Sequence, residues 1–274
     1  MTERSFSTDK PKETIDSIVD FFEQQRANGF SFRKLGLACF GPLDLRRKSP
    51  TWGYITATPK PYWSNTPIAV TLRNRLNCEV FIDTDVNAAA LAEHRWGAAQ
   101  GCSVCVYVTV GTGIGLGIIA NGKPLHGLIH PEGGHMLINV PDDPDIANIK
   151  GACPFHGNCV EGLASGSALA EIWGQPAHTL PPDHKAWDTQ AKVLAAMCHN
   201  IMVCYSPEKI VLGGGVMQQA GLINQIIVYA GHSLANYIML PAGVEFSDII
   251  VPPGLGQFSG LKGAMAVINF ADDA

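Results

Sequence analysis

A short group of cysteine and histidine residues in the middle of the chain has the composition of a metal site. Cys153, His156 and Cys159 form a C-x-x-H-x-x-C run, and His135 precedes them in the same irregular segment. Two thiols and two imidazoles are a complete tetrahedral set for Zn²⁺, and four protein ligands leave no open position for water. The sequence therefore predicts a structural zinc, with His130 as the alternative to His135.

Ordinary packing is the other interpretation of these residues, because cysteines are often buried and His156 suits a surface loop. The segment 131–166 is rich in Gly, Pro and Asp and has no hydrophobic periodicity, so packing gives no reason for three such side chains within 153–159. A metal would order this segment. It would also hold the two glutamates near its ends, Glu132 and Glu161.

A second polar cluster lies where a predicted strand, 79–82, meets an alanine-rich helix. Asp83, Asp85 and Asn87 alternate at this junction. Asp85 could act as a general base and Asn87 as a positioning group. Asp is also a good helix N-cap, and spacing alone favours a cap at Asp83 or Asp85.

Two glycine clusters are candidates for phosphate binding. Residues 103–120 read as strand, turn and strand, with glycine at positions 111, 113, 115 and 117. Gly213 to Gly215 follow a predicted strand, 209–212, and precede a predicted helix from Val216. Glycines allow backbone amides to approach and cradle an anion. Neither turn has the lysine of a P-loop, so each alone is weak evidence, but together they favour a nucleotide.

The elements around these residues alternate as in an α/β protein. The patterns predict a helix over 14–27, a strand over 34–40, a buried helix over 189–205 and a last helix over 261–270. The strand ends in the turn Gly41-Pro42-Leu43-Asp44, which is either a plain turn or a ligand site at a strand's carboxyl end. Residues 48–66 are irregular and contain Trp52, Tyr62 and Trp63, which is typical of a loop that covers a site.

Composition excludes several classes of protein. The 274 residues are 46% hydrophobic and 16% charged, as in a globular protein. A formal charge of -5 argues against nucleic-acid binding. Neither an apolar run long enough to span a membrane nor a signal peptide is found, so we expect a cytoplasmic protein without membrane partners. Reduced cysteines follow from this location, and Cys102 and Cys105 are interpreted as core residues.

Several motifs together resemble one family. They are FGPLD at 40–44, DTDVNAAALAE at 83–93, VTVGTGIGLG at 108–117, EGGH at 132–135, CPFHGNCVEGLASG at 153–166 and IVLGGGV at 210–216. In this combination and order the chain resembles the ROK family of sugar kinases. The C-x-x-H-x-x-C run and the segment 49–63 are most similar to its bacterial, zinc-containing fructokinase branch.

The resemblance implies an α/β, actin-like ATPase (ribonuclease H-like) fold with two lobes and a zinc-pinned loop. The small lobe would comprise residues 1–97 and be completed by the helix 261–274. The large lobe would comprise 98–260, with the zinc loop at 131–166. A hexose and ATP with Mg²⁺ would bind in the cleft between the lobes, and the protein would be a homodimer.

The resemblance also assigns roles to individual residues. Asp85 matches the catalytic base, and Asn87 falls outside the commonest sugar-contact position. The residues that match substrate contacts are Gly41, Pro42, Thr84, Glu132, His135 and Glu161. Those that match nucleotide contacts are Gly111, Thr112, Gly113, Gly213, Gly214 and Gly215. His135 would bind zinc through one ring nitrogen and face the sugar with the other.

The predicted reaction is ATP-dependent phosphorylation of a hexose, fructose to fructose 6-phosphate, with mannose as a second substrate. The family's N-terminal hairpin, with its Asp-x-Gly-Gly-Thr phosphate motif, has no match in this sequence. An N-terminally incomplete, catalytically impaired sugar-binding protein is therefore the alternative. A transcriptional repressor is a third reading, and the sequence shows neither the helix-turn-helix nor the basic recognition helix that it needs.

Overall fold

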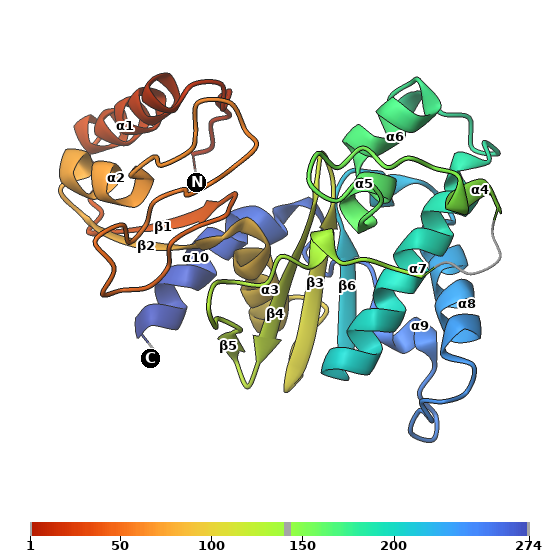
Figure 1. Ribbon diagram of the computed structural model, residues 1–274. Helices are drawn as coiled ribbons and strands as arrows, with labels where there is room; N and C mark the ends of the chain where they lie inside the picture. The colour runs from red at the N-terminus through yellow and green to blue at the C-terminus, as the bar shows by residue number, and fades with distance from the viewer. Residues whose placement is uncertain (1, 140–143, 273–274) are drawn as a thin grey trace.

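The computed structural model describes residues 2–139 and 144–272, whose elements form two groups (Figure 1). We call the first group the small lobe. It contains α1 (Pro11–Ala27), β1 (Lys34–Cys39), α2 (Ile68–Leu76) and β2 (Glu79–Thr84). β1 and β2 pair in parallel, so their carboxyl ends lie at the same edge of the sheet. The turn that begins at Gly41 and the polar cluster at Asp83 are thereby brought together.

The second group, the large lobe, is built on a five-stranded sheet of order β5-β4-β3-β6-β7. Its strands are β3 (Val104–Val110), β4 (Ile114–Ala120), β5 (Lys123–Pro124), β6 (Lys209–Gly213) and β7 (Ile250–Val251). β3 is antiparallel to β4 and parallel to β6. The predicted strand, turn and strand over 103–120 is confirmed, and its glycines join two paired strands.

Helices cover both faces of the large sheet. They include α5 (Val160–Ala164), α6 (Gly166–Trp173), α7 (Ala186–Tyr205), α8 (Leu222–Leu234) and two short helices, α4 (Pro144–Ala147) and α9 (Phe246–Ile249). Alternate residues of β3 face opposite sides, as strand geometry requires. Val106 and Val108 belong to the core formed with α7 and α8, whereas Cys105 and Tyr107 belong to the core formed with α3 (Asp85–Trp96).

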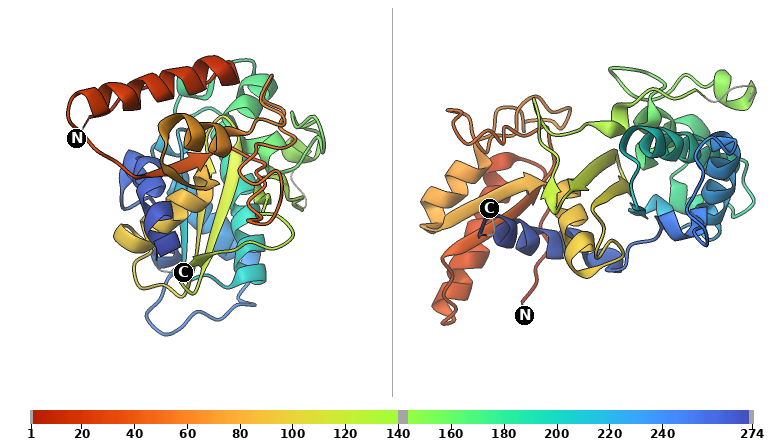
Figure 2. Two further views of the ribbon diagram at one scale, coloured as in Figure 1. Left: turned by 90° about the vertical axis from the view of Figure 1, so that its left-hand side faces the viewer. Right: turned by 90° about the horizontal axis from the view of Figure 1, so that it is seen from below.

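Two helices join the lobes, α3 and α10 (Ser259–Asp272) (Figure 1). The view from below shows α10 running from the large lobe beneath the small lobe, with α3 beside it (Figure 2). Two glycines allow this close packing. A Cβ at Gly36 of β1 would lie 1.8 Å from the Ala264 carbonyl oxygen, and one at Gly263 would lie 2.5 Å from the Ala88 carbonyl carbon.

A buried carboxylate fixes the segment that leads into α10. Glu93 is fully buried in α3. It accepts hydrogen bonds from the backbone N–H groups of Ala98 (2.8 Å), Gly254 (2.9 Å) and Leu255 (3.1 Å) and from the Ser259 hydroxyl (2.6 Å). Four donors satisfy the charge that burial would otherwise make costly. Glu93 therefore holds the start of α10 against α3.

The prediction of a helix directly after the triple glycine, Gly213 to Gly215, is wrong. Val216–Gln218 form only a 3-10 turn, and α8 begins at Leu222. Gly221 has φ +79°, a left-handed conformation that a continuous right-handed helix cannot contain. The last helix begins at Ser259, two residues before the predicted start.

Part of the predicted zinc loop, residues 140–143, lies outside the described residues, as do residues 273 and 274 of the predicted last helix. Among the helices that the structure describes, none has the length and apolar character needed to cross a membrane.

Candidate active site

One cavity of about 940 Å³ is lined by residues of both lobes. It contains every residue predicted to contact substrate, together with the predicted base and the first glycine turn. These lining residues are Gly41, Pro42, Thr84, Asp85, Gly111, Thr112, Gly113, Glu132, His135 and Glu161. Segments that are distant in the sequence thus meet at one place.

The junction of β2 and α3 presents Asp85 to this cavity. Thr84 is the N-cap of α3, because its Oγ1 accepts the Asn87 backbone N–H at 3.1 Å. The prediction that Asp83 or Asp85 caps the helix is therefore wrong. Asp83 is buried and accepts the Thr84 backbone N–H (2.7 Å) and the Asn87 side-chain amide (2.8 Å). Asn87 thus supports Asp83, and Asp85 is left at the cavity wall.

The surroundings of Asp85 suit a proton acceptor. Its side chain is exposed, but into the main cavity and into a second one of about 450 Å³. Protein on most sides raises the pKa of Asp85 by desolvation, against the opposing effect of the Val86 backbone N–H, 2.9 Å from Oδ1. A raised pKa makes a carboxylate a stronger base.

Two further carboxyls face the same space. The pKa of Glu132 is raised to about 7, first by desolvation from the surrounding protein, although 40% of its side chain is exposed, and then by the charges of Glu161 and Asp85. Glu161 lies in α5, and its Oε2 accepts the Ile114 backbone N–H at 2.9 Å. A Cβ at Gly113 would lie 2.7 Å from this Oε2, so the turn needs a glycine there. Glu161 therefore fixes the glycine turn beside the carboxyl cluster.

The predicted zinc ligands are clustered. Ligand atoms of His135, Cys153, His156 and Cys159 all lie within 4.8 Å of one another. His135 Nδ1 is 3.7 Å from Cys153 Sγ and 3.6 Å from Cys159 Sγ, and His156 Nδ1 is 3.7 Å from Cys153 Sγ. Atoms bound at about 2.0–2.3 Å to one tetrahedral zinc lie about 3.3–3.8 Å apart. The donor set and these three separations therefore fit Zn²⁺.

His135 joins this cluster to the cavity. With Nδ1 among the sulfurs, its Nε2 points to Glu161 and lies 3.8 Å from Oε1. The alternative ligand, His130, does not belong to the cluster. Its Nε2 instead accepts the Leu43 backbone N–H at 3.0 Å, so the interpretation of His130 as a zinc ligand is wrong.

The two glycine clusters lie near each other. The Gly111 carbonyl accepts the Gly166 backbone N–H at 2.7 Å, which ties the first turn to the start of α6. Behind this turn is a cavity of about 730 Å³, lined by residues that include Gly111, Thr112, Trp187 and Gly215. Gly214 and Gly215 also line the second cavity with Asp85. Gly213 itself packs against Tyr107 and Pro253.

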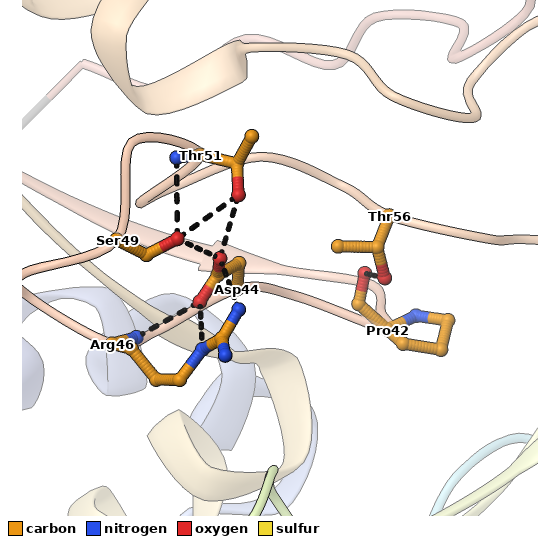
Figure 3. A network of polar contacts seen from close by, with 6 residues as sticks. All are labelled: Pro42, Asp44, Arg46, Ser49, Thr51 and Thr56. Carbon is orange, nitrogen blue, oxygen red and sulfur yellow. Dashed lines mark hydrogen bonds and ion pairs between the residues drawn. The ribbon is translucent and has the colours of Figure 1, made fainter.

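A polar network holds the loop that carries Pro42 (Figure 3). The buried Asp44 carboxylate accepts hydrogen bonds from Arg46 (Nε, 2.9 Å), Ser49 (2.5 Å) and Thr51 (2.7 Å). The Arg46 guanidinium, with these hydroxyls, holds the pKa of Asp44 well below its usual range. Thr56 donates from its hydroxyl to the Pro42 carbonyl at 3.1 Å. The rim of the cavity is therefore rigid here.

The irregular loop 48–66 reaches the cavity, but not through its aromatic rings. Residues 57–60 line the cavity, whereas Trp63 is 1% exposed and Tyr62 points to solvent. Lys60 was missed in the sequence, and its Nζ lies 4.7 Å from the Phe40 ring and 5.8 Å from the Trp63 ring. The sequence signal that could have identified Lys60 is a lysine close to several aromatic residues, because a lysine can stack its charge on an aromatic ring.

Comparisons with known proteins agree with this geometry. The family model described as "ROK family" matches residues 1–270. The chain is 46% identical to a fructokinase of Zymomonas mobilis, over 97% of this chain and 88% of that protein. It is 40% identical to a putative fructokinase of Bacillus subtilis, over 97% and 87%. Among solved structures it is similar to a ROK hexokinase from Thermus thermophilus, with a TM-score of 0.75, 28% identity and coverage of 98% and 90%.

Proposed function

This chain belongs to the ROK family, whose actin-like fold it shares, and we propose that it transfers a phosphoryl group from ATP to a hexose. Relatives named fructokinase, at 40–46% identity, support phosphorylation of a sugar. The observation on which the proposal rests is the position of Asp85. It stands at the wall of one cavity that is also lined by Glu132, by Glu161 and by the glycine turn.

In the proposed mechanism, Asp85 accepts the proton of the sugar hydroxyl while that oxygen attacks the γ-phosphorus and the bond to ADP breaks. The raised pKa of Asp85 suits this role. Its location at the start of α3, held by the Thr84 cap, keeps the carboxylate in place. Most of the rate enhancement in phosphoryl transfer comes from positioning and electrostatics, so this rigidity is functional.

Different residues around the cavity are assigned to the sugar and to the nucleotide. Glu132, His135 and Glu161 offer hydrogen-bonding groups to sugar hydroxyls, and Gly41 and Pro42 close the rim. Gly111, Thr112 and Gly113 would face the phosphates, and Gly214 and Gly215 would face the adenosine side. Gly213, also predicted to contact the nucleotide, instead packs behind them against Tyr107 and Pro253. The large cavity behind the first turn provides room for the rest of the nucleotide.

Two metals enter the proposal with different roles. Zn²⁺ would be held by His135, Cys153, His156 and Cys159, and it would order the loop that carries Glu132. Mg²⁺ would arrive with ATP and neutralise phosphate charge. Fructose is the proposed sugar because the relatives named above are described as a fructokinase and a putative fructokinase, and mannose is proposed as a second substrate. We also propose a homodimer with no nucleic-acid partner.

A coupled ADP-release assay with fructose, mannose and glucose tests the function. Asp85→Asn should lower kcat by about 10²–10⁴, the range for loss of a general base. Asp20→Asn, which changes an exposed side chain of α1, is the matched control and should retain wild-type turnover. Wild-type turnover that survives Asp85→Asn would contradict the role of Asp85. Absence of turnover while fructose raises Tm would indicate a sugar-binding protein instead.

A further inference from the structure

One imidazole contacts both lobes beside the proposed sugar site. His130 lies in the large-lobe segment between β5 and the Gly133–His135 turn, and its side chain is 3% exposed. Its Nε2 accepts the backbone N–H of Leu43, in the small lobe, at 3.0 Å. Its Nδ1 lies 3.3 Å from Oε1 of Glu132.

These contacts define the protonation state of the ring. A backbone N–H can only donate, so Nε2 must offer a lone pair to Leu43. A neutral ring then has its hydrogen on Nδ1, which lies near Glu132 Oε1, and the Pro131 carbonyl is a second acceptor for the ring. The ring is packed tightly, because a Cβ at Gly41 would lie 3.1 Å from its Cε1. The local structure thus selects one tautomer in one orientation.

We propose that His130, as the neutral Nδ1–H tautomer, is a positioning residue that orients Glu132 for the sugar and ties it to the small-lobe rim at Leu43. The inference rests on the proposed function, because it assigns Glu132 to sugar binding. His130 itself need not touch the sugar. It acts by giving Glu132 one position relative to Gly41 and Pro42, which line the cavity on the small-lobe side.

The charges around the ring make this arrangement dependent on pH. Glu132 faces Nδ1, and Asp83 interacts with the ring from β2, with His126 beside it, 3.1 Å from the Asp83 carboxylate. Burial lowers the pKa of His130, although the Pro131 carbonyl and Asp83 act in the opposite direction. The lowered pKa favours the neutral ring at pH 7. Protonation at lower pH would place a hydrogen on Nε2 opposite the Leu43 N–H. That contact would then be lost, so hexose affinity should fall as pH decreases.

Two substitutions separate the two contacts. His130→Asn can still donate an amide N–H toward Glu132 but cannot reach Leu43, and His130→Gln can offer its amide oxygen to Leu43 but not donate to Glu132. Fructose affinity, measured by calorimetry without ATP, should weaken about fivefold to tenfold in each, as for loss of one hydrogen bond. Nucleotide affinity should stay within about twofold. His232→Asn, an exposed residue of α8, is the control.

Nitrogen NMR of ¹⁵N-histidine-labelled protein gives a readout that does not depend on sugar. The His130 signals, identified by their absence in His130→Asn, should show the neutral Nδ1–H tautomer at pH 7. The Nε2–H tautomer, a protonated ring, or equal losses of fructose and nucleotide affinity would overturn the inference. Wild-type protein that binds no hexose would overturn both proposals. Hexose binding without turnover would overturn the kinase proposal alone.

Discussion

At the scale of residues, the surroundings of Glu132 change its acidity. Burial and neighbouring charge raise the pKa of Glu132 to about 7, above the usual 4.5. A strongly shifted pKa is typical of a catalytic or binding site. The shift arises first from burial and then from the charges of Glu161 and Asp85.

Replacing Glu132 by glutamine should change how stability depends on pH. Since the folded-state pKa of about 7 exceeds the usual 4.5, the folded protein binds more protons than the unfolded chain between these values. The stability that Glu132 contributes is therefore present below pH 4.5 and is lost as pH rises through 7. We expect the Tm of Glu132→Gln, relative to wild type, to increase across this window. Scanning calorimetry checks this, with the exposed Glu171→Gln as control; parallel curves would contradict it.

At the scale of elements, irregular segments are held by a few strong contacts. The Asp44 network holds the loop after Pro42, and Glu93 holds the entry to α10. The His135 cluster joins the segment around the 133–135 turn to the start of α5. Each device provides local order where hydrophobic periodicity is missing. The rim of the cavity is therefore built from pinned loops.

Zinc removal should loosen the loop that carries Glu132 and His135. We expect one zinc per chain by elemental analysis, and a chelator should lower Tm by several degrees, since metal binding and folding of such loops are coupled. Hexose affinity should fall with it, because His135 Nε2 would lose its position beside Glu161. Cys153→Ser should reproduce both effects, and the exposed Cys204→Ser should not. Protein without metal that melts as before would refute the zinc site.

At the scale of the whole molecule, α3 and α10 connect the two sheets by packing between the lobes. α10 packs on β1 through Gly36 and on α3 through Gly263, so both lobes share its apolar face. The cavity lies between the lobes, and its geometry therefore depends on this packing. The predicted boundary at residue 97, within the turn after α3, stays a prediction.

Adding one methyl group at Gly263 should disturb this joint. Its Cβ would lie 2.5 Å from the Ala88 carbonyl carbon, a backbone atom that cannot move alone. We expect Gly263→Ala to lose about 1–3 kcal/mol of stability, the usual cost of overpacking. Denaturant unfolding measures the loss. Gly260→Ala, in the first turn of the same helix with open space around it, is the matched control. Equal stability of the two variants would show that α10 is not tightly packed.

Much of this protein was predictable because the relevant residues are close in the chain or follow one period. The zinc ligands cluster as predicted because three of them lie within one short loop. β3 and β4 follow from alternation and the glycine turn between them. The ordered motifs identified the ROK family, which the family match confirms.

Only the tertiary structure decided which group uses which partner. The N-cap is Thr84 rather than an aspartate, because Asp83 is used by Asn87. His130 is excluded from the metal cluster by a hydrogen bond to Leu43, 87 residues away along the chain. Local sequence limits which contacts a side chain can make. Chain segments brought together by folding decide which of them it makes, because each donor or lone pair can be used only once.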